Sequence, residues 1–399
     1  MNLTPLTCLQ ILVLTVSISW PVGDNLVAAD LSAYEIHPED SMTYRAYNGS
    51  IDDRIPIRVF LCREGDRWEG SYFYSSLRLP LGLHNEAGKD ETPAPETSGR
   101  VVLTEGPLIG PEGSTGRWEG IFGDEFRSFE GTWHSPNGKN VLPIRLQESD
   151  ENDSLPAVFY RFSSSWTQSR GSIETRNENS ALVVQFESGN ESVRRINAAI
   201  REAAADAFDT GGPAESDLVR QGDGNPFTDL ERAIRAEPVA PENLGLGLSG
   251  SDIQELTIQP VYNEGGYVTV RLHVRYYQGG AHSNYTDRYL TFETATGRLL
   301  DLRRDVLKPG YEEPLARAAE VQLRRNLGLK PGAALSAGPL DVDEIELNEN
   351  WFLTVGGIGF SHEPYEVAAF AMGFVSYLLP WDDLRPWLRD GALAPLPGK

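Results

Sequence analysis

The chain has 399 residues, of which 40% are hydrophobic and 10% aromatic. This composition excludes a disordered polyanion, and the length allows two or three domains, each with a hydrophobic core. Its formal net charge of −23 is spread along the sequence, so the surface repels nucleic acid and anionic lipid and attracts basic partners. No nucleic-acid partner is therefore expected.

The first 29 residues are predicted to be a secretory signal peptide. Residues 9–20 are an apolar run, and Val27, Ala28 and Ala29 offer a small-residue cleavage site, although no basic residues precede the run. The run is shorter than the roughly 20 apolar residues of a typical membrane-spanning helix, and no later stretch has about 18 uninterrupted apolar residues. We therefore expect a secreted or periplasmic protein with no stable membrane insertion after cleavage. The alternative is a short N-terminal anchor that is retained.

Cleavage would leave Cys62 as the only cysteine, so no intrachain disulfide is expected in the mature protein. Cys62 ends a strand-like apolar run that begins at Val59. We interpret it as a small buried hydrophobic residue rather than a nucleophile.

Residues 30–150 are predicted to form a small all-β domain, either a barrel or a sandwich. An aromatic-Glu-Gly-x-aromatic repeat occurs three times, in residues 68–72, 118–122 and 129–133. Its two aromatic residues lie four apart and share one face of a strand, and its glycine permits a bend or a close approach of another strand. Because aromatic residues normally fill strand cores, we favour a hairpin core over a platform that stacks on sugars.

Residues 151–250 follow a charged linker and are predicted to form a small α+β domain. Strands come first, and then apolar residues recur at helical spacing from Val193 until Gly211, Gly212 and Pro213 stop the helix. A capping-box spacing at residues 228–231 predicts another short helix, and residues 238–250 are a Pro/Gly-rich connection.

Residues 251–399 are predicted to begin with strands. Val268, Val270 and Leu272 alternate with polar residues such as Arg271 and His273, so one face packs on a core and the other faces solvent or a partner. Glycine-containing turns at residues 279–280 and 296–297 favour an antiparallel meander.

A helix with Leu315, Ala318, Ala319 and Leu323 inward and a hairpin through Gly356 and Gly357 are expected next. The predicted fold class is therefore α+β, with antiparallel sheets and packed helices in the C-terminal two-thirds, preceded by the small all-β domain.

Several of these motifs resemble a known family. The turn at residues 279–282, the Thr296–Gly297 turn and the Pro364-Tyr365-Glu366 segment ahead of Gly373 resemble the C-terminal domain of RsiV-like and PdaC-like bacterial envelope proteins. A weaker match around Asn197 resembles the smaller domain that usually precedes it. The resemblance covers about residues 155–388. It implies a fold and a domain of unknown function, and it identifies no reaction.

The exposed ends of the family-like segments supply the residues that we expect to contact a ligand, which are Tyr277, His282, Tyr285, Glu363, Tyr365 and Glu366. His282 also has a simpler interpretation, in which its ring fixes the turn by hydrogen bonding. No catalytic residue is assigned.

His362 and Glu363 are similar to the start of a zinc-protease helix, but Glu366 stands where the second histidine is required, and Pro364 disfavours the helical turn. No metal site and no cofactor are therefore expected.

RsiV-like proteins look like lysozyme receptors, so the resemblance implies a non-enzymatic binding or sensing module of the envelope whose partner is a basic protein such as a lysozyme. PdaC-like deacetylation depends on a separate domain with a metal-binding Asp/His set, which this sequence does not contain, so that activity is not transferred. The alternative is a cell-wall glycan-binding accessory protein, or a weak wall-active hydrolase with a carboxylate site. A structural or assembly role is a third hypothesis.

Overall fold

The computed structural model describes residues 37–38, 42–64, 67–74, 80–85, 100–107, 114–123, 125–149, 154–170, 173–208, 252–277 and 281–394. Four predicted features lie outside these ranges: the signal peptide, the glycine turn at 279–280, the helix stop at 211–213, and the capping box and connection within 228–250. No helix in the described ranges is long and apolar enough to cross a membrane.

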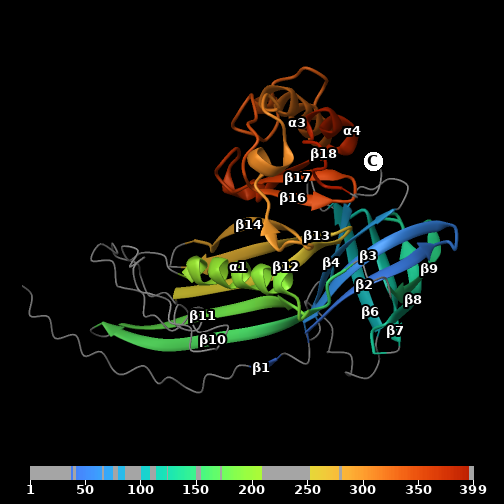
Figure 1. Cartoon of the computed structure of the whole chain (residues 1–399). Coiled ribbons are helices and arrows are strands. Elements are labelled where there is room, and N and C mark those ends of the chain that lie inside the picture. The colour runs from blue at the N-terminus through green and yellow to red at the C-terminus, as the bar shows by residue number, and fades with distance from the viewer. Residues whose placement is uncertain are drawn as a thin grey trace, which may run out of the picture.

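The first region is a closed barrel of eight consecutive strands (Figure 1). The strands are β2 (Met42–Ile51), β3 (Ile55–Glu64), β4 (Arg67–Tyr74), β5 (Pro80–His84), β6 (Arg100–Pro107), β7 (Gly116–Gly123), β8 (Ser128–His134) and β9 (Val141–Glu148). All neighbours are antiparallel, and β9 pairs with β2, so the barrel has no open edge. Of the two predicted architectures, the structure has the barrel.

The aromatic-Glu-Gly repeats build the interior of this barrel. Trp68 and Trp118 are buried, and the ring of Trp68 stacks on Phe122 at 4.3 Å between centroids. A Cβ on Gly120 would lie 2.5 Å from the carbonyl oxygen of Glu130 on the next strand, so only glycine fits there. The predicted hairpin core and the predicted close strand approach are both confirmed.

A buried carboxylate joins the three repeats. Glu105 is only 2% exposed, and its Oε2 accepts hydrogen bonds from Tyr72 Oη (2.6 Å), Trp118 Nε1 (3.2 Å) and Trp133 Nε1 (2.8 Å). Its Oε1 accepts a bond of 2.7 Å from the hydroxyl of Thr115. Burial, followed by the charge of Glu105, raises the pKa of Tyr72, so this phenol stays protonated and donates.

The second region is a seven-stranded sheet. Its strands, in spatial order, are β1 (His37–Pro38), β10 (Ala157–Arg170), β11 (Ile173–Phe186), β12 (Asp252–Glu264), β13 (Tyr267–Tyr277), β14 (Asn284–Glu293) and β15 (Arg298–Leu299). β11 and β12 run parallel, and the other neighbours are antiparallel, so β12 to β15 form the predicted meander. The predicted division at residue 250 falls between β11 and β12, which are neighbours in this sheet.

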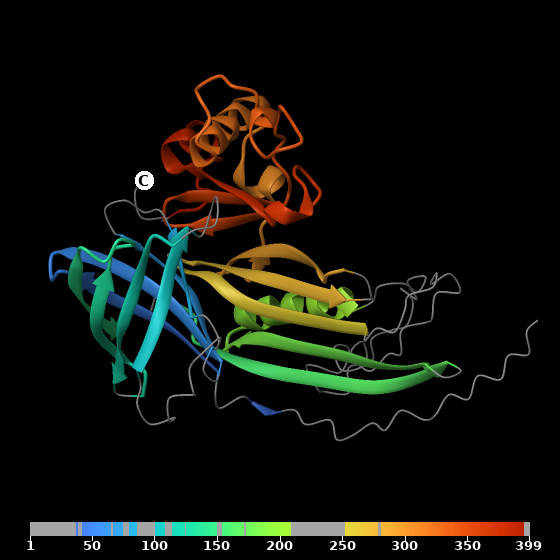
Figure 2. The same ribbon diagram turned by 180° about the vertical axis from the view of Figure 1, so that it is seen from behind.

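Helix α1 (Glu191–Phe208) covers one face of the sheet (Figure 2). Its Asn197 side chain both donates to the carbonyl oxygen of Phe186 and accepts from its N–H, each at 2.9 Å, which fixes the helix to β11. Gly297 has a φ of +72°, and a Cβ there would collide with the backbone of Ser192, so the predicted Thr-Gly turn lets the helix approach. Five of the six apolar residues that recur at helical spacing are buried, namely Val193, Ile196, Ile200, Ala203 and Ala204, and the sixth, Ala207, is partly buried.

The C-terminal lobe lies over β13 and β14 (Figure 1). It contains a three-stranded antiparallel sheet of β16 (Trp351–Thr354), β17 (Gly357–His362) and β18 (Val375–Pro380). Its helices are α3 (Glu312–Asn326) and α4 (Trp381–Leu384). As predicted, α3 buries Leu315, Ala319 and Leu323, and Ala318, also predicted inward, is partly buried against the same core. The described chain is thus mostly antiparallel sheet with few helices. The prediction of packed helices across the C-terminal two-thirds overstated their share, because strands such as β10 and β11, of 14 residues each, together take up more of that region than its helices do.

Buried polar contacts fix the barrel against the end of the large sheet. Arg58 of β3 is buried, and its Nε lies 3.4 Å from Glu264 Oε2 of β12. Beside this pair, the fully buried side chain of Asn263 of β12 accepts from the N–H of Leu155 (2.9 Å), in the segment that follows the barrel, and donates to its carbonyl oxygen (2.8 Å).

Candidate functional site

Strands β12, β13 and β14 present nine side chains on one face, because residues that stand opposite each other in register share a face. We call these nine residues the polar face. Its three cross-strand rows are Gln259–Arg271–Tyr289, Thr257–His273–Asp287 and Glu255–Arg275–Tyr285.

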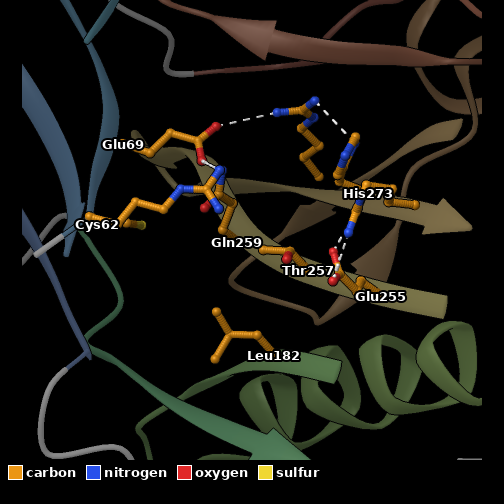
Figure 3. A pocket seen from close by; sticks show the side chains of 10 residues that line it. Cys62, Glu69, Leu182, Glu255, Thr257, Gln259 and His273 are labelled. Carbon is orange, nitrogen blue, oxygen red and sulfur yellow. Dashed lines mark hydrogen bonds and ion pairs between the residues drawn. The ribbon is translucent and has the colours of Figure 1, made fainter. Parts of the chain in front are cut away.

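The barrel covers part of the polar face and encloses a cavity of about 240 Å³ (Figure 3). Cys62, Arg67 and Glu69 come from the barrel, and Leu182 comes from β11. The sheet contributes Glu255, Thr257, Gln259, Arg271, His273 and Arg275. We call this cavity the cleft.

Charged side chains of the polar face hold one another. Asp287 is 3% exposed; its Oδ2 accepts from Arg271 Nε at 2.8 Å, and its Oδ1 lies 2.8 Å from His273 Nδ1. Burial opposes the charge of Arg271, but Asp287, Tyr289 and Glu69 together outweigh burial and raise the pKa of that guanidinium. Arg275 donates to both oxygens of Glu255, at 2.8 and 3.0 Å, which lowers the pKa of Glu255 and raises that of Arg275. The guanidinium groups of Arg271 and Arg275 are therefore positively charged and are held in place by these carboxylates.

Cys62 forms part of the cleft wall and is buried. Burial, followed by the charge of Glu69, raises the pKa of its thiol. The thiol is therefore protonated at neutral pH, and the predicted structural role is confirmed.

Cys62 is expected to resist alkylation in the native protein. The thiolate is the reactive species, and the raised pKa suppresses it, so iodoacetamide at pH 7.5 should modify Cys62 at least about 100-fold more slowly than in urea. Mass spectrometry of the Cys62 peptide measures both rates. Similar native and denatured rates would contradict the buried, protonated thiol.

Beside the cleft, five rings form a second cluster, which we call the aromatic edge and which consists of His282, Tyr285, Tyr365, Phe370 and Phe374. Phe370 is its centre: His282 stacks on it at 4.0 Å, and Tyr285 and Tyr365 lie at 5.2 and 5.5 Å between centroids. Phe374 lies 5.1 Å from Tyr285, 6.3 Å from His273 and 5.9 Å from the guanidinium carbon of Arg271. The aromatic edge is therefore continuous with the polar face.

The turn that carries Tyr365 is unusual. Tyr365 is 67% exposed and has a φ of +71°, a region that non-glycine residues seldom adopt. Next to it, Glu366 Oε2 accepts from the N–H of Glu363 at 2.9 Å, and Glu366 Oε1 lies 2.6 Å from His362 Nδ1. Burial, followed by the charge of Glu366, raises the pKa of Glu363. The turn thus presents an exposed ring between two carboxyl groups.

The C-terminal lobe carries a recognisable family segment. Residues 304–382 match the family model described as a protein of unknown function, DUF3298. This DUF3298 segment includes α3, the three strands of the small sheet and the turn at Tyr365.

Two solved structures that are similar to the chain are described as members of that family. A DUF3298 protein from Bacteroides fragilis is 19% identical, with a TM-score of 0.45, over 61% of this chain and 99% of the other. A DUF3298 protein from Pseudomonas aeruginosa is 16% identical, with a TM-score of 0.42, over 60% and 96% of the two chains. No curated protein matches the sequence.

The structure groups five of the six residues predicted to contact a ligand. His282, Tyr285 and Tyr365 belong to the aromatic edge, and Glu363 and Glu366 flank Tyr365 in the DUF3298 segment. Tyr277 stands at the end of β13 opposite Ile253, outside the aromatic edge. His282 Nδ1 also lies 3.0 Å from the carbonyl oxygen of Ser283, as the turn-fixing interpretation requires.

Sequence reasoning missed Asp287, Gln259, Phe370 and Phe374. The alternation along β14 signals which residues share a face, but not that Asp287 stands opposite His273. Phe370 and Phe374 lie in a short irregular segment before β18, where no periodicity marks them.

Within the described ranges, no cluster of three or more His, Cys, Asp or Glu side chains has the geometry of a metal site. His362, the residue most similar to a zinc-protease ligand, pairs with Glu366.

Proposed function

We propose that this protein is a non-enzymatic, extracytoplasmic binding module of the bacterial envelope, and that the aromatic edge with Glu363 and Glu366 is the surface that meets its ligand. One observation carries the proposal. Phe370 gathers three rings, two of them on exposed residues, next to two carboxyl groups. The RsiV-like and PdaC-like resemblance and the signal peptide expected at residues 1–29 support the placement in the envelope.

Exposed aromatic rings are suited to binding. They offer a large contact area at low entropic cost and are enriched among the residues that dominate interface affinity. Tyr365 is held in a strained backbone conformation, a cost of about 1–3 kcal/mol that proteins retain mainly at functional sites. This favours Tyr365 as the central contact.

The charge of the protein favours a basic partner. The chain carries a net charge of −23, and Glu363 and Glu366 flank the exposed ring. Complementary charges accelerate association and select partners. We therefore infer that the ligand is a basic protein, and a lysozyme is the most specific candidate.

The mature chain is expected to bind a basic lysozyme with an affinity that falls at least about tenfold between about 0.1 and 1 M salt, as the Debye length shrinks from about 10 to 3 Å. Isothermal titration calorimetry measures the affinity at both salt concentrations. Lysozyme with acetylated lysines is the matched control, because it keeps its shape and loses positive charge. Absence of binding at low salt, or equal binding of the acetylated form, would overturn the proposal.

The alternative hypothesis is a wall-active hydrolase that uses the carboxyl pair. Glu363 has a raised pKa, as a general acid requires, but Glu366 is already engaged by His362 and by the N–H of Glu363. Turnover of peptidoglycan that disappears in Glu366→Gln would favour the hydrolase and count against the binding module.

A further inference from the structure

We propose that the cleft is a second binding site, and that it takes one uncharged sugar ring with Gln259 as a contact residue. This proposal goes beyond the binding of a basic protein, since it concerns a different cavity and a different class of ligand.

The first argument is Gln259 itself. It lines the cleft and is only 8% exposed, and none of the described residues forms a hydrogen bond with its amide. Its amide atoms are not among the fully enclosed polar atoms of the described residues, so they are open to the cleft, where water or a ligand can hydrogen-bond to them. One water needs about 10–15 Å³ of such cavity volume, and the cleft has about 240 Å³. The amide therefore faces a space large enough for a ligand.

The second argument is the charge balance. Three guanidinium groups, of Arg67, Arg271 and Arg275, line the cleft with two carboxylates, of Glu69 and Glu255. Asp287 lies outside the lining and pairs with Arg271, so the six formal charges cancel in a chain whose net charge is −23. A charged ligand would meet a like charge on either side of the cleft. A neutral ligand meets none.

The third argument is loose pairing around Glu69. Its Oε1 lies 3.5 Å from Arg271 Nη1, and its Oε2 lies 3.7 Å from Arg67 Nη2, both longer than the roughly 2.7–2.9 Å of a strong charge-assisted bond. Glu69 therefore has acceptor capacity to spare, and the two guanidinium groups have spare donors. A hydroxyl group both donates and accepts, so it can bridge such a pair.

The fourth argument is the shape of the wall. Cys62, as a protonated thiol, and Leu182 form an apolar surface, and the polar side chains of β12 and β13 line the rest of the cleft (Figure 3). A sugar ring has the same division, with hydroxyl groups around its rim and C–H groups on its faces. An uncharged monosaccharide unit matches the size, charge and polarity of the cleft.

The test uses four sugars and ligand-detected NMR titration of the mature chain. Glucose and N-acetylglucosamine are uncharged, and glucosamine and glucuronate carry one positive and one negative charge on a similar ring. At least one neutral sugar is expected to bind, with both charged sugars at least about tenfold weaker. No binding of either neutral sugar, or equal binding of a charged one, would overturn the proposal and leave the cleft to water.

Two variants locate the site. Gln259→Leu is nearly isosteric and removes an unpaired amide, so the protein is expected to remain folded and to lose about tenfold in affinity for the neutral sugar. Thr257→Val provides the same test if Gln259→Leu fails to fold, and the exposed Gln147→Leu is the control that leaves sugar affinity unchanged. Unchanged sugar binding in both cleft variants would contradict the assignment. Gln259→Leu should not alter lysozyme binding, so the two proposals can fail independently.

Discussion

Replacing Glu105 with leucine is expected to destabilise the barrel by about 4 kcal/mol. Its carboxylate receives hydrogen bonds from Tyr72, Trp118, Trp133 and Thr115, one ring from each of the three repeats and one hydroxyl. Leucine leaves the two indole N–H groups and the Thr115 hydroxyl without this acceptor, while Tyr72 keeps its contact of 3.1 Å with the hydroxyl of Tyr74. Each buried donor left unpaired costs about 1–3 kcal/mol. Urea unfolding followed by tryptophan fluorescence measures the loss, because two of the donors are indoles.

Glu105→Gln is the matched control. Its amide oxygen can still accept from Tyr72, Trp118 and Trp133, and its NH₂ group can donate to the Thr115 hydroxyl, which accepts as readily as it donates. The expected loss is about 1 kcal/mol, for the charge alone. Equal losses in the two variants would show that the carboxylate does not organise the barrel core.

Gly120→Ala is expected to cost about 3 kcal/mol. A Cβ at this position would lie 2.5 Å from the carbonyl oxygen of Glu130 and would also collide with the ring of Phe129. The β7–β8 pair must separate or the ring must move, and overpacking of this kind costs about 1–3 kcal/mol in well-packed cores. Differential scanning calorimetry of the variant measures the loss as a lower unfolding temperature.

Gly189→Ala provides the comparison, because nothing lies within 4 Å of a Cβ at that position. Its unfolding temperature should equal that of the wild type or rise slightly, since alanine reduces the entropy of the unfolded chain. An equally small effect of Gly120→Ala would contradict the close strand approach in the barrel.

The elements of this fold follow largely from local patterns. The repeats at 68–72, 118–122 and 129–133 predict strands with buried aromatic faces, because a period of two fixes which residues share a face. Helical spacing in the same way predicts the buried residues of α1 and α3. These features depend on neighbours in the sequence, so one sequence suffices to predict them.

The candidate site depends on distant pairings, which local patterns do not contain. The alternation of β13 predicted that Arg271, His273 and Arg275 share one face of the strand. Their interactions, however, depend on Asp287 of the neighbouring strand and on Glu69 of the barrel. The barrel closes through the pairing of β2 with β9, which are its first and last strands in the sequence. A one-residue slip in any of these registers would move every partner to the opposite face.

The aromatic edge combines residues that local patterns predict with a residue that only distant packing brings to them. His282, Tyr285 and Tyr365 were predicted as ligand contacts because they occupy the expected exposed ends of family-like segments. The ring that unites them, Phe370, belongs to a single turn of 3₁₀ helix with no pattern of its own. The sequence therefore predicted the participants, and only the packing of the DUF3298 segment on β14 groups them.

The affinity of Tyr365→Ala for a basic lysozyme tests the central claim most directly. Tyr365 is 67% exposed, so its truncation should leave the fold intact and lower the affinity at least about tenfold. Ile121→Ala, at a 55% exposed apolar residue of the barrel, is the matched control and should change the affinity less than about twofold. Loss of affinity in Tyr365→Ala alone is the predicted result. Equal affinities of the wild type and both variants would contradict the assignment of the aromatic edge as the binding surface.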